Sequence, residues 1–356
     1  MAVKDTLVSL GMTTVAAPVI LVSLLIRRAR SLTSEQGGQL PFKEDLHRSL
    51  SSILPLKAIR HHLQPRPLNP ILESNRFEAF KDQLCIRVSS DSCNGYWICK
   101  GPPGKLRSVQ ESDMVCLWFH GGAYCFGDPL GPAVSLLRVA KIAATRGVSI
   151  SIFSVEYTLA PAATFPQQQC EATAAYRHLL EAEGISAERI IIAGDSAGGA
   201  LLLYPWINLT NNSPSFESNR DKDMISKRFL DRCVEAVIGE RGRVEALNLE
   251  DLVNPWEPGT EQDWKEILPS FTWVNVGAHD VLLHDVQTFV QRAKAKGAQL
   301  ELKITPSKPH RWNFDLDKES EDLYCKLRPD DQVPAGMMTG SSTIAEGLLT
   351  VLYGGN

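Results

Sequence analysis

Ser196 stands at the centre of a glycine-flanked turn, residues 194–198 (Gly-Asp-Ser-Ala-Gly), directly after the apolar, branched run 189–193. A serine that attacks a carbonyl carbon must project from a tight strand-to-helix turn, so the residues two positions before and after it must be small. Gly194 and Gly198 meet that need. A lone Gly-x-Ser-x-Gly can arise by chance, but its place after a strand-like run predicts a nucleophilic serine for acyl transfer.

A second glycine turn lies upstream, at residues 120–124 (His-Gly-Gly-Ala-Tyr), after another strand-like run. Acyl transfer passes through a tetrahedral oxyanion, which backbone N–H groups stabilise. Glycines let such groups come close, so Gly121, Gly122 and the N–H of Ala197 are the predicted donors. An ordinary glycine turn is the alternative, and the nearby serine turn argues against it.

The serine also needs a histidine base. Three histidines follow Ser196 in the chain, His279, His284 and His310, as the order serine, acid, histidine requires. His310 comes after the last strand-like run, where a returning loop can reach the serine. We therefore predict His310 as the base.

The base must be oriented by a carboxylate. Asp280 follows the strand-like run 272–276, and catalytic groups gather at the carboxyl ends of strands in an open α/β sheet. Asp285 is the alternative acid, although it equally fits the start of a helix over 286–296. The predicted triad is Ser196, Asp280 and His310.

Strand-like and helix-like runs alternate from about residue 81 onward. This alternation predicts an α/β fold whose central sheet is mostly parallel, with helices on both faces. The first two runs are joined by a short polar segment, as in an antiparallel start. The strand-like runs are residues 83–88, 96–100, 114–119, 148–155, 189–193, 201–206, 272–276 and 300–304, and the helix-like runs are 132–145, 166–183 and 285–296.

Three units follow from the pattern. Residues 1–30 form an anchor with a basic flank, residues 31–80 a proline-containing linker with one or two cap helices, and residues 81–356 the hydrolase-type domain. Residues 213–265 are polar and broken by turns, which suits a cap insertion. Residues 341–352 have the apolar spacing of a closing helix.

Residues 6–26 contain no charge, and Arg27, Arg28 and Arg30 follow directly. About 20 apolar residues in a helix cross a bilayer, and this run is too long for a signal-peptide core. We expect a single-pass anchor in the membrane of the endoplasmic reticulum, with a buried helix as the alternative. The arginines favour a cytosolic catalytic domain, whereas Lys4 lies on the other side, so both orientations stay open.

Composition excludes several classes of partner and cofactor. The net charge of −4, without a long run of Lys and Arg, does not indicate a nucleic-acid partner. The eight cysteines form no Cys-x-x-Cys pair and no cluster with histidines, so we expect no metal site. Most of them lie in apolar runs as reduced core residues, although Cys93 and Cys99 could pair in an oxidising compartment.

The glycine turn 120–124, the serine turn 194–199 and the segment 280–282 (Asp-Val-Leu) resemble the hormone-sensitive-lipase family of α/β hydrolases. So do residues 156–161 (Glu-Tyr-Thr-Leu-Ala-Pro) and 204–210 (Tyr-Pro-Trp-Ile-Asn-Leu-Thr). The resemblance runs from about residue 112 to 314. With its anchor, the chain is most similar to membrane-bound arylacetamide and steryl-acetate deacetylases, particularly fungal ones.

The resemblance implies a serine hydrolase without metal or organic cofactor. Its substrates would be small-molecule esters with small acyl groups, acetates among them, on apolar alcohols or amines. The family's roles fall on Ser196 as nucleophile, Asp280 as acid and His310 as base. Its oxyanion donors fall on Gly121, Gly122 and Ala197, and its structural histidine falls on His120.

One departure from the family bears on catalysis. Only Ala200 separates Gly199 from the strand-like run 201–206, where the family has a full helix before the next strand. A parallel crossover needs a dozen or more residues. The chain is therefore about 20–25 residues short at this point, as after an exon skip or in an inaccurate gene model. A catalytically dead ligand binder or truncated product is thus the alternative to an esterase, and a peptidase or lipase on the same fold is a third.

Overall fold

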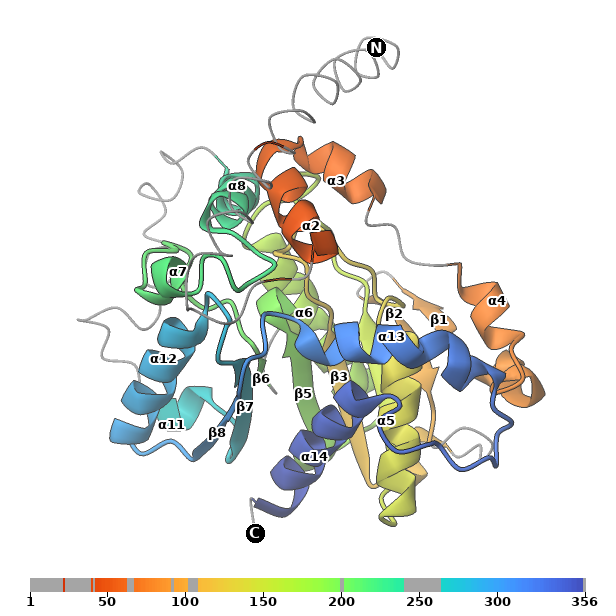
Figure 1. Ribbon diagram of the computed structural model, residues 1–356. Coiled ribbons are helices and arrows are strands. Elements are labelled where there is room, and N and C mark those ends of the chain that lie inside the picture. Colours follow the sequence, from red (N-terminus) through yellow and green to blue (C-terminus); the bar gives the residue numbers. More distant parts are fainter. Residues whose placement is uncertain are drawn as a thin grey trace.

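The computed structural model describes Val22, Leu40 and residues 42–62, 67–90, 93–101, 108–198, 202–239 and 264–354 of the chain. Within this part, eight strands form one sheet in the order β1-β2-β4-β3-β5-β6-β7-β8 (Figure 1). The strands are β1 (Ile86–Ser89), β2 (Asn94–Cys99), β3 (Met114–Phe119), β4 (Ile150–Val155), β5 (Ile190–Asp195), β6 (Leu202–Leu203), β7 (Thr272–Gly277) and β8 (Leu300–Thr305).

The sheet is antiparallel at its start and parallel thereafter. β1 pairs with β2 and β2 with β4 in antiparallel fashion. Every pair from β4 through β3, β5, β6 and β7 to β8 is parallel. The predicted fold class, including the antiparallel start, is confirmed. Because β3, β5 and β7 are parallel, the loops after them meet at one edge of the sheet.

Helices cover both faces of the sheet, and β3 shows how. Its alternate residues Cys116 and Trp118 belong to a core cluster that includes α5 (Ala133–Thr145). Leu117 and Phe119 belong to a separate cluster with α6 (Gln167–Arg177). α14 (Thr339–Gly354) packs against α5 and β7. The period-two alternation of a strand buried on both sides explains why β3 reads as a continuous apolar run.

The remaining helices frame the sheet. They are α2 (Phe42–Ile53), α3 (Leu56–His62), α4 (Leu68–Leu72), α7 (Ser215–Ser218), α8 (Lys227–Ile238), α11 (Trp264–Ile267), α12 (Leu283–Ala295) and α13 (Trp312–Lys326). α2 contacts α8, so the N-terminal segment lies against the predicted cap insertion (Figure 1). The predicted helices over 132–145, 166–183, 285–296 and 341–352 correspond to α5, α6 with a π turn at His178–Ala182, α12 and α14.

Two expectations differ from the structure. The 15-residue helix α13 was not predicted, because five acidic residues in its sequence leave little apolar periodicity. The predicted strand 201–206 is shortened to β6, because Tyr204 adopts a positive φ of 41° and Pro205 lacks a ladder donor. The predicted anchor over 6–26 lies outside the described residues apart from Val22. No helix in the described part is long and apolar enough to cross a membrane.

The cysteines follow the prediction in most positions. Six of the eight are buried, and all eight are free, including Cys93 and Cys99. Burial raises the pKa of the Cys116 thiol to about 12, so it behaves as a small apolar core residue.

Candidate active site

The turn that carries Ser196 begins where β5 ends. Ser196 adopts a left-handed φ of 54°, a conformation that non-glycine residues rarely take. A Cβ atom on Gly194 would lie 2.1 Å from the Gly198 carbonyl oxygen, and one on Gly198 would lie 2.2 Å from the Phe119 carbonyl oxygen. Both positions therefore need glycine, because the turn packs directly against the end of β3.

Replacing Gly198 with alanine should lower the free energy of unfolding by about 1–3 kcal/mol, because the new methyl group meets rigid backbone. Urea unfolding followed by circular dichroism measures this change. Gly131→Ala is the matched control. It has an ordinary backbone conformation, and its Cβ would meet only the Asp128 carbonyl oxygen, at 3.2 Å. Equal stability of the two variants would contradict the close packing of the serine turn.

His310 and Asp280 are brought together by the loops that follow β8 and β7. His310 Nδ1 lies 3.0 Å from Asp280 Oδ2, and both side chains are buried. Asp280 Oδ1 accepts a hydrogen bond from the Leu282 N–H at 2.8 Å, which fixes the carboxylate plane. The rival Asp285 instead accepts hydrogen bonds from Asn208 and Ser213. The structure thus pairs the predicted base with the predicted acid.

A second buried carboxylate, Asp223, lies beneath this pair. Its Oδ2 accepts a hydrogen bond from the Val281 N–H at 2.6 Å, and its Oδ1 accepts one from the His310 N–H at 3.1 Å. Asp223 therefore joins the acid loop to the base loop. Burial, followed by the charge of Asp280, raises the pKa of Asp223 to about 7. Sequence reasoning missed this residue because it lies in the polar segment 213–265, without a motif around it.

Burial on its own lowers the pKa of His310, but the negative charges of Asp280, Asp223 and Asp195 outweigh it, so the pKa lies above its ordinary value. Replacing Asp223 with asparagine removes one of these charges, so the pKa of His310 should fall. Titration of the His310 ring protons by NMR measures the shift without requiring activity. Asp221→Asn, on the same loop but more than half exposed, should leave the titration unchanged. An unchanged midpoint in Asp223→Asn would contradict the coupling.

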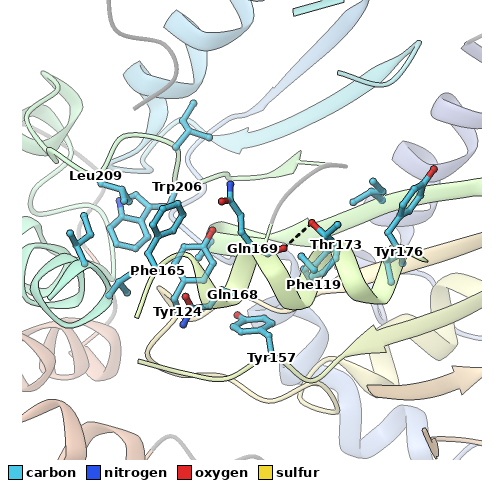
Figure 2. Close-up of a pocket in the computed structure, with 18 residues that line it drawn as sticks. Phe119, Tyr124, Tyr157, Phe165, Gln168, Gln169, Thr173, Tyr176, Trp206 and Leu209 are labelled. Carbon is cyan, nitrogen blue, oxygen red and sulfur yellow. Dashed lines mark hydrogen bonds between the residues drawn. The ribbon is translucent and has the colours of Figure 1, made fainter. Parts of the chain in front are cut away.

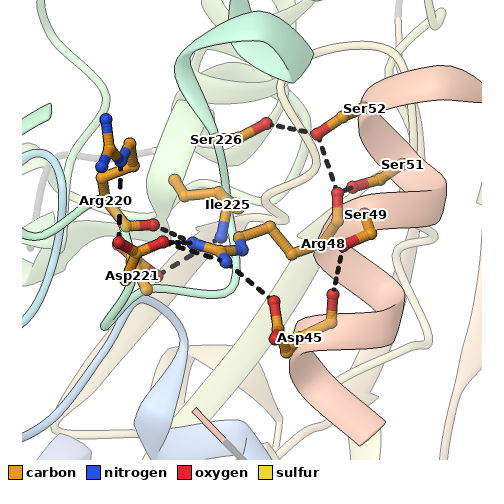
Figure 3. A network of polar contacts seen from close by, with 10 residues as sticks. Asp45, Arg48, Ser49, Ser51, Ser52, Arg220, Asp221, Ile225 and Ser226 are labelled. Carbon is orange, nitrogen blue, oxygen red and sulfur yellow. Dashed lines mark hydrogen bonds and ion pairs between the residues drawn. The ribbon is translucent and has the colours of Figure 1, made fainter. Parts of the chain in front are cut away.

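The N-terminal helix α2 contacts the loop that carries Asp223, at a position two residues before it. Arg48 on α2 is buried and bonds to Asp45 Oδ1 at 2.7 Å and to Asp221 Oδ1 at 3.4 Å (Figure 3). Asp221 precedes Asp223 by two residues. Helix α2 thus packs against the loop that precedes Asp223, a contact that the sequence alone did not indicate.

Within the described residues, no hydrogen bond joins Ser196 Oγ to the His310 ring. The ring of Tyr204 packs edge-on against the His310 ring, with 4.7 Å between centroids and 62° between planes. The Tyr204 hydroxyl is buried and has no hydrogen-bond partner in the part of the chain that is described. The predicted acid and base are therefore in hydrogen-bond contact, whereas the base is not hydrogen-bonded to the predicted nucleophile in the described structure.

The glycine turn differs in one respect from the expectation. The Gly121 N–H donates to Asp195 Oδ1 at 2.7 Å, so it is not available to an oxyanion. Gly122 and Ala197 remain the predicted donors. Ala123, with a φ of 51°, follows on the same turn and is a further candidate, because no hydrogen bond to its N–H is found among the described residues.

His120 has a structural environment, as the sequence predicted. Its ring stacks on Tyr157, with centroids 4.2 Å apart, and its Nδ1 lies 2.9 Å from the Gly121 carbonyl oxygen. Burial lowers the pKa of His120. The neutral ring thus holds the glycine turn against Tyr157, two residues after the end of β4.

The connection after Ser196 is very short. β5 and β6 are adjacent parallel strands in the register Gly194↔Leu202 and Asp195↔Leu203. Only residues 196–201 join them, and a single 3₁₀ turn, Ser196–Gly198, lies in the described part of this connection. Since both strands belong to the sheet, the six residues between them are too few for the helix that the family resemblance implies at this point, whose N-terminal dipole would stabilise an oxyanion.

A sequence model of the family described as "alpha/beta hydrolase fold" matches residues 116–202 and 199–314, more than half of the chain. The chain belongs to this family. The two matches meet at residues 199–202, where the helix is missing. The membership confirms the α/β-hydrolase fold expected from the serine and glycine turns.

Relatives in this family are esterases. An acetyl-hydrolase of Streptomyces hygroscopicus is 24% identical over 247 residues, which cover 64% of this chain and 75% of that protein. The carboxylesterase NlhH of Mycobacterium tuberculosis is 27% identical over 240 residues, which cover 58% and 69%. A hormone-sensitive lipase from a metagenome library has a similar structure, with a TM-score of 0.58 at 25% identity over 81% of this chain and 97% of the other. The chain is thus of the hormone-sensitive-lipase type.

Proposed function

We propose that the chain is a serine carboxylesterase with Ser196 as nucleophile. The contact of 3.0 Å between His310 and Asp280 carries this proposal, because it places an oriented base at the same sheet edge as a serine on a strained turn. His310 would take the Ser196 proton as Oγ attacks the ester carbonyl, and would give it to the departing alcohol. Water, deprotonated by His310, would then release the acid from the acyl-enzyme.

The sequence resemblance and the relatives support a narrower class of substrate than carboxylic esters in general. We propose small acyl esters, acetates among them, of apolar alcohols. The printed name of the Streptomyces relative, an acetyl-hydrolase, supports this class. Tyr124 and Trp206, whose ring centroids lie 6.4 Å apart, line an apolar cavity together with Ala197 and Gly198 of the serine turn.

Hydrolysis of p-nitrophenyl acetate by the full chain, compared with Ser196→Ala, tests the proposal. We expect p-nitrophenol release that depends on Ser196. Equal rates for the two proteins would overturn the catalytic assignment.

The second candidate is a catalytically impaired member of the family that binds ligands or is a truncated product. Two observations favour this candidate. No hydrogen bond joins Ser196 to His310 in the described structure, and the connection between β5 and β6 is short. The transcript around codons 199–201 separates the two candidates. A recovered helix-length segment there would favour an active enzyme, and its absence would leave the assay above to decide.

We further propose that residues 6–26 anchor the protein as a single pass in the endoplasmic reticulum membrane. Their charge-free length, followed by three arginines, supports this proposal. Retention of the full chain in the membrane pellet after alkaline carbonate extraction would agree with it. A glycosylation sequon introduced into residues 31–75 would report on which side the catalytic domain lies.

A further inference from the structure

Two cysteines that lie 108 residues apart in the chain are in contact in the folded protein. Cys125 belongs to the glycine turn, and Cys233 lies on α8 in the predicted cap insertion. The Cys125 Sγ atom lies 3.8 Å from the Cys233 carbonyl oxygen, and a hydrogen bond also joins the two thiol groups. The pair considered from the sequence, Cys93 and Cys99, belongs instead to two separate core clusters.

The neighbours of the two thiols hold them in place. Phe126, next to Cys125, stacks on Phe229 with ring centroids 5.5 Å apart. Phe229 lies one helical turn before Cys233 on α8. On the other side, Arg60 of α3 donates to the Cys125 carbonyl oxygen at 2.6 Å. The glycine turn and α8 are therefore in register for a bond between the sulfur atoms.

The two thiols differ in reactivity. A hydrogen bond from the Cys233 thiol lowers the pKa of Cys125; burial opposes this effect, and the charge of Arg60 adds to it. The same hydrogen bond raises the pKa of Cys233. Burial alone raises the pKa of Cys116 to about 12. Because the thiolate is the reactive form of cysteine, Cys125 is the thiol suited to react first and Cys233 the one suited to follow.

A cavity of about 510 Å³ brings solvent close to this pair (Figure 2). It lies against β5, whose residues 190–192 are only partly buried, whereas every residue of the neighbouring β3 is buried. Ile192 lines the cavity, and so do Tyr124 of the glycine turn and Val237 of α8. Tyr124 and Val237 lie one residue and one helical turn, respectively, from the two cysteines. A small oxidant in the cavity therefore reaches both segments that carry the thiols.

We propose that Cys125 and Cys233, which are free in the structure, form a disulfide when hydrogen peroxide oxidises the chain. The Cys125 thiolate attacks one peroxide oxygen and the O–O bond breaks, which leaves a sulfenic acid on Cys125. The departing hydroxide takes up the proton that Cys125 lost and becomes water. The Cys233 sulfur then attacks the Cys125 sulfur, the S–O bond breaks, and a second water leaves with the Cys233 proton. The two thiols lose two electrons, and the peroxide gains them.

This disulfide would fasten the glycine turn to α8. The Cys125 N–H donates to the Gly122 carbonyl oxygen at 3.0 Å, so a restraint at Cys125 extends to the part of the turn that carries the predicted oxyanion donors. A bond between residues 108 positions apart also restricts the unfolded chain. We expect oxidation to raise the midpoint of thermal unfolding by about 5–10 °C. The bond does not depend on ester hydrolysis, so its test is separate from that of the proposed function.

The test treats the full chain with hydrogen peroxide, digests it with trypsin in the absence of a reductant, and identifies linked peptides by mass spectrometry. We expect two peptides joined through Cys125 and Cys233, two hydrogens lighter than their sum, which dithiothreitol separates. Fragmentation assigns the bond, because Cys116 shares the tryptic peptide 108–138 with Cys125. Absence of the linked pair, or a bond from Cys125 mainly to another cysteine, would overturn the proposal. This result requires no variant, so it stands even where a variant fails to fold.

Thermal unfolding of the reduced and oxidised forms gives a second measurement. The rise in the midpoint should be lost in Cys125→Ala and in Cys233→Ala. Cys116→Ala is the matched control, because Cys116 is as deeply buried as the pair, and it should keep the rise. A rise of unchanged size in Cys125→Ala, or its loss in Cys116→Ala, would assign the stabilisation to another oxidised group and contradict the proposal.

Discussion

Replacing Ser196 with alanine is expected to lower kcat/KM for p-nitrophenyl acetate by about 10³-fold or more. Removing the nucleophile of a complete serine triad costs about 10⁶-fold in kcat. The expected loss is smaller here, because no hydrogen bond joins Ser196 to His310 in the described structure and the six residues between β5 and β6 are too few for a helix that would support the oxyanion, so the unmodified chain starts from a lower rate. Initial rates of p-nitrophenol release measure the effect.

The control for Ser196→Ala must account for surface groups that react slowly with p-nitrophenyl acetate. Ser218→Ala removes an exposed hydroxyl on α7 and should hydrolyse the ester at the unmodified rate. A small loss in Ser196→Ala, equal to that in Ser218→Ala, would assign the observed hydrolysis to groups outside the proposed site.

Replacing Asp280 with asparagine is expected to reduce kcat/KM by about 10³–10⁴-fold. Asp280 accepts the hydrogen bond from His310 Nδ1, so the Nε2 atom stays free to accept the serine proton. An asparagine side chain can instead donate to Nδ1, which would stabilise the wrong tautomer of the ring. Its volume is the same, so the loss would report on proton position rather than on packing. Steady-state kinetics with p-nitrophenyl acetate measure it.

Asp285→Asn is the matched control for Asp280→Asn. Asp285 is also buried and lies five residues further along the chain, but its oxygens accept hydrogen bonds from Asn208 and Ser213. We expect a loss in kcat/KM of less than about tenfold. A larger loss in Asp285→Asn than in Asp280→Asn would reverse the assignment of the acid.

The sheet and the acid–base pair could be predicted from the sequence for a common reason. β3 was predicted to the residue, because a strand covered on both faces is a continuous branched and aromatic run. Asp280 follows another such run, β7, and His310 follows the neighbouring edge strand β8; in a parallel sheet the carboxyl ends of adjacent strands meet. The local sequence pattern locates the strand ends, and the parallel sheet then brings Asp280 and His310, which follow those ends, close together.

Other parts of the site depend on contacts that no local pattern records. Asp223 acts through backbone N–H groups 58 and 87 residues away in the chain. The Gly121 N–H was predicted as an oxyanion donor because glycine permits a close approach, but the group that approaches is the Asp195 carboxylate. Sequence spacing indicates which residues can come near, whereas the partner of each N–H is decided by tertiary packing.

The partly open face of β5 has a consequence for the life of the protein in a cell. Branched apolar side chains that reach the surface of a central strand are what quality-control factors bind when they sort unfinished proteins from finished ones. A ligand that fills the space beside Ile192 would cover these exposed apolar side chains and stabilise the folded form by mass action. The steady-state abundance of the protein is therefore expected to follow the supply of that ligand.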